Sequence, residues 1–330
     1  MSNLIEHYSK NERCLVATVE LCTTCNWRCR HCYIPNHDCA GFSNEGIKEL
    51  LCRLKDFGVY EVDFTGGEIF SREDCIEIIR YAREKGFAVD ILSNASLLSD
   101  EIVNELAKCN IEFFDCTIFS MDSRIHDWFV QKDGAFDLAI SNILKLREKG
   151  INVKMKCILT KYNWSSYKDI MLFCKEHDIE YLFTLDLYKR NNGDDLPLKM
   201  RVPEKYIEKV ISDISVDNGI SYEKVTEDDY ICRSSRYGLF ISATGDVQPC
   251  GNYKKRIGNV NDDSLASLWD KEEYIKVRNM RVKDTEKCTD CKLKKYCFSC
   301  PGINELEGYT SLGCREFDLN LAKVRMKCFG

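Results

Sequence analysis

Short apolar runs alternate along the chain with stretches in which apolar residues recur every three or four positions. The short runs are rich in Val, Ile and aromatic residues, which is typical of buried strands. They span residues 14–21, 60–65, 88–92, 113–119, 153–159 and 181–185. The stretches between them have the spacing of amphipathic helices. Three groups carry it: Ile47, Leu50, Leu51 and Leu54; Ile76, Ile79 and Ala82; and Phe136, Ile140, Ile143 and Leu144.

The ends of the expected helices carry residues that start or stop a helix. We expect N-caps at Ser43, Ser71 and Ser99, and C-terminal stops at Gly58, Gly86 and Gly150. Helical crossovers make successive strands parallel, and functional residues then collect at the carboxyl ends of the strands. Six such units take about 180 residues, whereas a closed eight-unit barrel takes about 250. The sequence therefore predicts an α/β fold, a partial (β/α)6 barrel of the TIM type.

Four segments are expected. Residues 1–13 form an N-terminal segment, 14–200 the partial barrel, 201–230 a linker helix region and 231–330 a small cysteine-rich domain. The boundary rests on the polar, turn-rich stretch 191–196 and the helical pattern 203–214 that follows it. A length of 330 residues also suggests about two domains.

Composition narrows the class of protein. Hydrophobic residues make up 44% and charged residues 30%, which is typical of a globular chain. The net charge is −6 without a long block of like charge, so we expect neither nucleic acid nor membrane as a partner. The N-terminus lacks the apolar core of a secretory signal, and this predicts a cytoplasmic protein. In that compartment disulfides are reduced, so the 20 cysteines indicate metal binding.

The cysteines fall into two groups with a gap between them. Six lie in residues 14–39 and eight in residues 232–328, while six more are scattered between Cys52 and Cys174. The scattered six stand in apolar patterns, where cysteine behaves as a small hydrophobic residue. We therefore look for metal chemistry in the two groups alone.

The first group holds Cys25, Cys29 and Cys32 in the spacing C-x3-C-x2-C, directly after the first predicted strand. Three thiolates suit a [4Fe–4S] cluster in which one iron stays open. The alternative is zinc, which needs four ligands; His31 could supply the fourth, although it is adjacent to Cys32. Cys22 is more typical of a free thiol than of a further ligand.

This motif resembles that of the radical S-adenosylmethionine (SAM) enzymes. The resemblance implies that the open iron chelates SAM and that one electron from the reduced cluster cleaves it. The resulting 5′-deoxyadenosyl radical abstracts a hydrogen atom from the substrate, so the cofactor carries the chemistry and the protein orients it. It also implies an electron donor of the flavodoxin or ferredoxin type.

Further positions match the family's SAM-binding elements. Thr65, Gly66, Gly67 and Glu68 follow the second strand. Paired glycines let backbone approach a ligand, and the resemblance assigns this element to the amino group of SAM. It assigns ribose contacts to Ser93, Asn94 and Ser120, and an adenine contact to Tyr33.

The motifs leave two roles in the first site unassigned: the partner of the SAM carboxylate and the catalytic base. Many relatives carry arginines where this chain has Trp128 and Val130, so the partner of the SAM carboxylate is not given by the motif; Lys156, on the fifth strand, is a candidate. Asp122 is a candidate catalytic base, although an acidic residue beside a cofactor can equally serve to orient it.

The second group resembles the SPASM extension of radical SAM enzymes. Its pattern is Cys232, Gly245 and Cys250, then C-x2-C-x5-C-x2-C and a last cysteine. Seven thiolates could serve two auxiliary [4Fe–4S] clusters, one of them a protein ligand short; a pair of zinc knuckles is the alternative. The resemblance assigns one cluster to Cys288, Cys291, Cys297 and Cys314, and the other to Cys232, Cys250 and Cys300. The two-residue spacing before Cys300 departs from the usual three, and Cys328 is more typical of a free thiol.

SPASM enzymes act mostly on peptides, so the resemblance implies a maturase that installs a thioether or carbon–carbon crosslink in a ribosomally made precursor peptide. Residues 187–198 and 201–203 resemble the connection seen in many peptide maturases. Thirteen residues before the first strand are too few for a peptide-binding domain, so we expect a separate leader-recognition protein. The alternatives are an enzyme acting on a heme precursor or other small metabolite, and a non-catalytic iron–sulfur or zinc scaffold.

Overall fold

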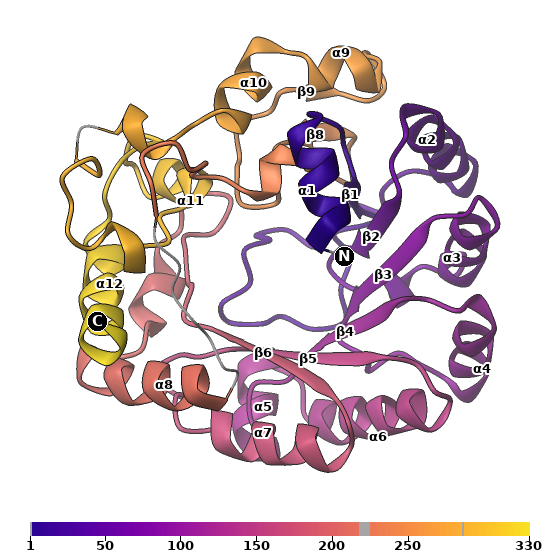
Figure 1. Cartoon of the computed structure of the whole chain (residues 1–330). Helices are drawn as coiled ribbons and strands as arrows, with labels where there is room; N and C mark the ends of the chain where they lie inside the picture. The colour runs from indigo at the N-terminus through magenta and orange to yellow at the C-terminus, as the bar shows by residue number, and fades with distance from the viewer. Residues whose placement is uncertain (1, 218–224, 286) are drawn as a thin grey trace.

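The strands form one sheet that curves into an open barrel. The computed structural model describes residues 2–217, 225–285 and 287–330 (Figure 1). Within them the strand order is β6-β5-β4-β3-β2-β1-β7-β8-β9. The six strands of the barrel are all parallel: β1 (Val16–Glu20), β2 (Glu61–Thr65), β3 (Ala88–Ser93), β4 (Phe113–Thr117), β5 (Val153–Ile158) and β6 (Glu180–Thr184). The prediction of a partial (β/α)6 barrel is confirmed.

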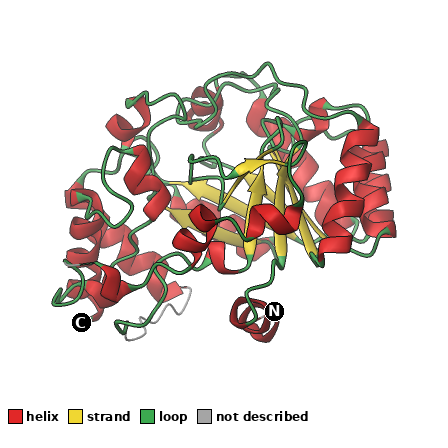
Figure 2. Cartoon of the chain, turned by 90° about the horizontal axis from the view of Figure 1, so that it is seen from above, coloured by secondary structure: helices red, strands yellow, loops and turns green. Residues whose placement is uncertain are grey.

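Helices cover the outer side of this sheet (Figure 1). They are α2 (Asn44–Phe57), α3 (Cys75–Glu84), α4 (Asp100–Cys109), α5 (Ser123–Val130), α6 (Ala135–Glu148) and α7 (Tyr167–Glu176). Each buries its apolar stripe against the strands; in α2 this stripe is Ile47, Leu50, Leu51 and Leu54, as the spacing predicts. Loops gather at the carboxyl ends of the strands, above the arrowheads in Figure 2.

Two of the three expected N-caps are confirmed. The hydroxyl of Ser43 accepts from Gly46 N at the start of α2, and that of Ser99 accepts from Ile102 N at the start of α4. The third prediction, Ser71, is wrong. Residues Ile69–Ser71 form a short 3-10 turn, the Ser71 hydroxyl donates to the Glu68 carbonyl, and α3 begins only after Asp74.

The C-terminal part continues the same sheet on its other edge. Strand β7 (Gly238–Ile241) pairs in parallel with β1, and β8 (Asp246–Gln248) and β9 (Gly258–Asn259) follow it in antiparallel order. The remaining helices are α1 (Ser2–Lys10), α8 (Glu204–Asp217), α9 (Leu265–Trp269), α10 (Glu272–Arg278), α11 (Pro301–Leu306) and α12 (Glu316–Phe329). Helix α12 packs against α8, so the cysteine-rich end of the chain faces the open side of the barrel (Figure 1). Among the described helices, none combines the length and the apolar character needed to cross a bilayer.

Candidate active site

A cavity of about 260 Å³ lies at the carboxyl ends of the barrel strands. Its wall is built from the loop after β1, the ends of β2 to β5 and the loop after β6. Eight of the expected site residues line it: Cys25, Cys29, Cys32, Tyr33, Gly66, Gly67, Ser93 and Asn94. Segments far apart in the sequence therefore converge on one chamber.

The three cysteines of the first motif lie on a loop that is tied to α5. Arg28 N donates to the carbonyl of Val130 and Arg30 N to that of Phe129, both at 3.0 Å. Buried Trp27 packs edge-on against His126, with ring centroids 5.4 Å apart. These contacts hold the loop in one conformation, with its thiols at the cavity wall.

The environment of these thiols fits a metal cluster. Burial, helped by the charges of Glu68 and Cys32, raises the pKa of Cys25 to about 11. Burial, helped by the thiols of Cys32 and Cys25, raises the pKa of Cys29 well above its ordinary value. The pKa of Cys32 is also raised, chiefly by burial. Three thiolates this close would repel one another in a buried site unless bound cations offset their charge. All three are free of disulfide bonds.

His31, which the zinc alternative used as a fourth ligand, is surrounded by aromatic rings. Its ring meets Phe119 edge-on, with centroids 4.9 Å apart, and lies 6.5 Å from Phe129. Burial lowers its pKa to about 4, so the ring is neutral at pH 7. It lines the cavity beside Cys32.

The two glycines after β2 pack directly against the cysteine loop. A Cβ on Gly66 would lie 2.5 Å from the carbonyl oxygen of Cys22, and one on Gly67 would lie 2.3 Å from that of Thr23. Gly67 N donates to Cys22 O at 2.9 Å. Only glycine fits so close an approach, and it leaves backbone exposed at the cavity wall.

Glu68 does not line the cavity, because it is 1% exposed and its carboxylate is hydrogen-bonded inside the protein. One carboxylate oxygen accepts from Phe70 N at 3.0 Å and from the Ser93 hydroxyl at 2.8 Å, and the other accepts from Asn94 N at 2.7 Å. Glu68 therefore joins the ends of β2 and β3 and places Ser93 and Asn94.

Ser120 and Asp122 also lie outside the cavity wall. The Ser120 hydroxyl is within 2.9 Å of that of Ser166 and accepts from Asp122 N. Asp122 caps α5 and forms an ion pair with Arg124 at 2.7 Å, which holds the pKa of the carboxyl below its usual range. The structure thus ties Asp122 to the start of a helix.

Among the cavity residues, the sequence patterns gave no role to Asp115, Asp186 and Tyr188, whereas Lys156 was a candidate partner of the SAM carboxylate. Asp115 on β4 is 7% exposed and forms an ion pair with Lys156 on β5, and both side chains line the chamber. Asp186 and Tyr188 reach it from the loop after β6. Lys156 lies 41 residues after Asp115, and Asp186 lies 30 residues after Lys156, so spacing along the chain gave no signal that these residues meet.

The structure brings the seven cysteines of the second motif into two sets. Burial and then the thiols of Cys232 and Cys300 raise the pKa of Cys250 to about 12. The pKa of Cys314 is raised by burial and then by Cys288 and Cys291, and Cys314 acts in turn on Cys297. Two neighbouring sets follow: Cys232, Cys250 and Cys300, and Cys288, Cys291, Cys297 and Cys314.

Tyr188 lies between the first motif and one of these sets. Burial raises the pKa of its phenol, and the charges that raise it further include those of Cys250, Cys300 and Cys32.

The two cysteines that the sequence analysis treated as free thiols lie apart from these sets. Cys22 is buried, with its thiol directed at the carbonyls of Thr24 and Glu68, and Cys328 is on α12 near the end of the chain.

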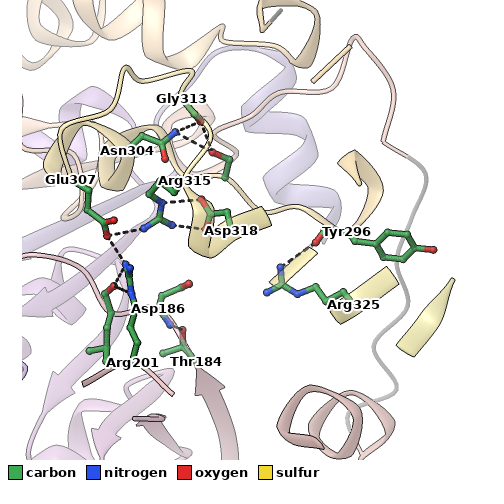
Figure 3. Close-up of polar contacts among 12 residues, drawn as sticks. Thr184, Asp186, Arg201, Tyr296, Asn304, Glu307, Gly313, Arg315, Asp318 and Arg325 are labelled. Atoms are coloured by element: carbon green, nitrogen blue, oxygen red, sulfur yellow. Dashed lines mark hydrogen bonds and ion pairs between the residues drawn. The ribbon is translucent and has the colours of Figure 1, made fainter. Parts of the chain in front are cut away.

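A buried network of ion pairs stands beside the second set (Figure 3). Arg315, directly after Cys314, is 3% exposed and contacts Asp318 at 2.6 and 2.9 Å and Glu307 at 2.9 Å. Glu307 is shared with Arg201, which also donates to the carbonyl of Leu187 in the cavity wall. The network therefore connects the cysteine-rich domain to the loop after β6.

Two family models match the chain. The radical SAM superfamily model covers residues 19–174, and the SPASM model, an iron–sulfur cluster-binding domain, covers residues 232–292. The chain is a radical SAM enzyme with a C-terminal SPASM domain. The enzyme accordingly takes S-adenosylmethionine and [4Fe–4S] clusters as cofactors, and the cysteine loop described above lies inside the first match.

Similar proteins include a heme synthase and proteins of peptide biosynthesis. The enzyme is 26% identical to the AdoMet-dependent heme synthase of Nitratidesulfovibrio vulgaris, over 87% of each chain. It is also 26% identical to the subtilosin biosynthesis protein AlbA of Bacillus subtilis, over 88% of this chain and 68% of AlbA. The crystal structure of Streptococcus suis SuiB bound to its precursor peptide SuiA has the same fold. Its TM-score is 0.72 at 18% identity, over 95% of this chain and 78% of SuiB.

Proposed function

We propose that the enzyme abstracts a hydrogen atom from a precursor peptide and installs a crosslink, a thioether or a carbon–carbon bond. The observation that carries this is the charge of the cavity. Lys156 is the one lysine or arginine in the described cavity wall, and its ammonium is already paired with the carboxylate of Asp115. Asp186 adds a second carboxylate to the wall. Such a chamber suits an uncharged peptide side chain better than a polyanion.

The chain's own residues divide the work around this chamber. Cys25, Cys29 and Cys32 would hold the cluster that, with SAM bound, supplies the hydrogen-abstracting radical. The backbone at Gly66 and Gly67 would approach the amino end of SAM. Ser93 and Asn94 would contact its ribose, and Tyr33 its adenine.

The other sequence-based assignments follow from position. Lys156 would meet the SAM carboxylate in exchange for Asp115. Ser120 would act on the ribose only indirectly, through the end of β4. Asp186 reaches the chamber, so we assign the proton acceptor to Asp186 in preference to Asp122.

The SPASM domain would place two auxiliary clusters on the far side of the substrate. Cys232, Cys250 and Cys300 would hold one of them, next to Tyr188, and Cys288, Cys291, Cys297 and Cys314 the other. A crosslink removes two hydrogen atoms from the peptide, so one further electron must leave the substrate, and an auxiliary cluster held by these cysteines would accept it. A separate protein would present the leader of the peptide.

A heme precursor is the second candidate, because the similarity to the heme synthase extends over most of both chains. An iron coproporphyrin carries four carboxylates, and a site for it needs unpaired cations. Among the described cavity residues the carboxylates of Asp115 and Asp186 outnumber the one cation, Lys156, so we place this substrate second.

The experiment compares both substrates under one set of conditions. The enzyme, reconstituted with iron and sulfide without oxygen, is incubated with SAM, a reductant and either a short peptide encoded beside its gene or iron coproporphyrin III. We expect 5′-deoxyadenosine and a peptide that has lost two hydrogen atoms, detected by mass spectrometry. Release of carbon dioxide from the porphyrin, with the peptide unchanged, would overturn the proposal in favour of the second candidate.

A further inference from the structure

An exposed aromatic pair lies directly over the cysteine loop. Trp128 on α5 is 39% exposed and Tyr162, in the loop after β5, is 46% exposed. Their ring centroids are 4.7 Å apart. Large exposed aromatic side chains beside each other are typical of contact surfaces. We call the surface formed by this pair and three neighbouring cations, Arg28, Arg30 and Lys161, the Trp128/Tyr162 surface.

This surface is joined to the loop that carries the first motif. Arg30, between Cys29 and Cys32, places its guanidinium 4.3 Å from the Trp128 ring centroid and donates to the Trp128 carbonyl at 2.9 Å. The backbone of Arg28 donates to Val130 one residue beyond Phe129. A protein docked here would contact the segment that holds the cysteines.

A column of rings leads inward from the same surface. Trp128 contacts Phe129 at 5.1 Å between centroids, Phe129 stacks on Phe119 at 4.9 Å, and Phe119 meets His31 at 4.9 Å. Phe119 and His31 line the cavity with Cys29 and Cys32. The column therefore gives an electron a short route of contacting rings from the surface to the site of the first cluster.

The charge of the surface selects its partner. Arg28 and Lys161 are exposed, and the Lys161 ammonium lies 5.0 Å from the Tyr162 ring centroid. The nearby carboxylate of Asp127 accepts hydrogen bonds from the backbone N–H groups of Gly134 and Phe136, at 2.7 and 2.8 Å. The enzyme as a whole carries a net charge of −6. An acidic partner would therefore be repelled elsewhere and attracted here.

We propose that the Trp128/Tyr162 surface docks a small acidic flavoprotein of the flavodoxin type, which delivers the electron that reduces the first cluster. In the step, the anionic flavin hydroquinone becomes the neutral semiquinone and the cluster gains that one electron. The flat rings of Trp128 and Tyr162 offer aromatic faces on which the planar ring of an exposed flavin can stack. The proposal rests on the enzyme's cluster and is independent of the substrate.

The test uses the reconstituted enzyme without peptide or porphyrin, so it reports on docking even where the proposed substrate is wrong. Lys161→Glu and Trp128→Ser are compared with Lys85→Glu. Lys85 is a matched control, since its ammonium also lies over a tyrosine ring, 5.2 Å from the Tyr81 centroid, at the end of α3 far from the cavity. Two readouts are taken: the affinity for oxidised flavodoxin, by calorimetry, and the stopped-flow rate of cluster reduction by flavodoxin hydroquinone.

We expect Lys161→Glu to weaken affinity and slow reduction by flavodoxin about fivefold, and Trp128→Ser by about tenfold. Lys85→Glu changes neither, and reduction by dithionite is the same in all variants with equal iron content. Added salt should reduce the difference between wild type and Lys161→Glu in flavodoxin affinity and in the rate of cluster reduction. Equal effects of Lys161→Glu and Lys85→Glu, or slowing with a ferredoxin but not with flavodoxin, would overturn the proposal.

Discussion

Buried carboxylates on neighbouring strands give the inside of the barrel an unusual chemistry. Oxygen atoms of Glu61, Asp63 and Asp90 lie within 4.8 Å of one another, below the cavity wall at Asp115. Burial and then the adjacent carboxylates raise the pKa of Asp63 and of Asp90 to about 7. Like charges this close disfavour ionisation, so their protonation depends on pH in the neutral range.

This makes stability depend on pH in a defined direction. Because the pKa of Asp63 is higher in the folded chain than its ordinary value near 3.8, the folded state loses stability as pH rises from about 4 to about 7. Asp63→Asn keeps an acceptor for the Thr18 hydroxyl and cannot ionise. We expect it to raise the free energy of unfolding by about 1–3 kcal/mol at pH 8 and by much less at pH 5.

Thermal and urea unfolding at the two pH values measure this effect. Asp56→Asn, at an exposed position near the end of α2, is the control and should show no such pH dependence. A gain in stability from Asp63→Asn that is equal at pH 5 and pH 8 would contradict the assignment.

The individual cysteines can be separated by iron counting. Cys300 neighbours Cys250 and Cys232, whereas Cys328 stands near the end of α12. We expect Cys300→Ala to lower the iron content by about four per chain, the content of one [4Fe–4S] cluster, and Cys328→Ala to leave it unchanged. Iron and acid-labile sulfide are assayed in reconstituted protein, and equal iron in both variants would remove Cys300 from the ligands.

At the scale of elements, the first site depends on two loops that follow adjacent strands. The loop after β1 carries the cysteines and the loop after β2 carries the glycines. They touch through backbone groups and through the side chains of Cys22, Thr24 and Ser71. Glu68 then joins the second loop to the end of β3. The geometry at three strand ends is therefore coupled through these contacts.

Gly67→Ala tests this coupling. The new methyl group would lie 2.3 Å from Thr23 O and 2.4 Å from Thr24 O, so the cysteine loop must shift. We expect a loss of about 1–3 kcal/mol in unfolding free energy and SAM binding at least about tenfold weaker, measured by calorimetry. Gly46→Ala on α2 is the control; its Cβ would have neighbours no closer than 3.4 Å, and SAM affinity should not change. Unaltered SAM affinity in Gly67→Ala would show that the close approach is not needed.

At the scale of the whole molecule, the contacts that attach the SPASM domain to the barrel include a strand pair and a network of ion pairs. Strand β7 pairs with β1, and the ion pairs of Arg315, Glu307 and Arg201 reach the loop after β6. The second attachment is buried, and the removal of one partner would leave a charge without compensation. It fixes the auxiliary cysteines relative to the cavity.

Arg315→Met should therefore destabilise the enzyme by about 3–5 kcal/mol, because Asp318 is left buried and unpaired. Lys327→Met removes the exposed pair with Glu208 and should cost about 0–1 kcal/mol. Urea denaturation followed by circular dichroism compares the two variants. Equal costs would mean that the network adds nothing beyond an ordinary surface pair.

The sequence by itself determined the features that depend on neighbouring residues. Strand and helix periodicity predicted the six-strand barrel, and the spacing of Cys25, Cys29 and Cys32 indicated the cluster loop, because three ligands on one loop need no distant partner. The N-cap at Ser71 failed for a tertiary reason: its hydroxyl is used by Glu68 and the loop after β1.

Only the tertiary structure decided which distant residues meet. Asp115 and Lys156 lie 41 positions apart and pair because β4 and β5 are adjacent. Tyr188 neighbours Cys32 and Cys250 because the chain returns past the open side of the barrel. The donors around a carboxylate also decide what it does. Those of Glu68 include Ser93 and Asn94 at the end of β3, which only the fold brings to it, whereas Asp122 is held by its sequence neighbour Arg124 at the start of α5.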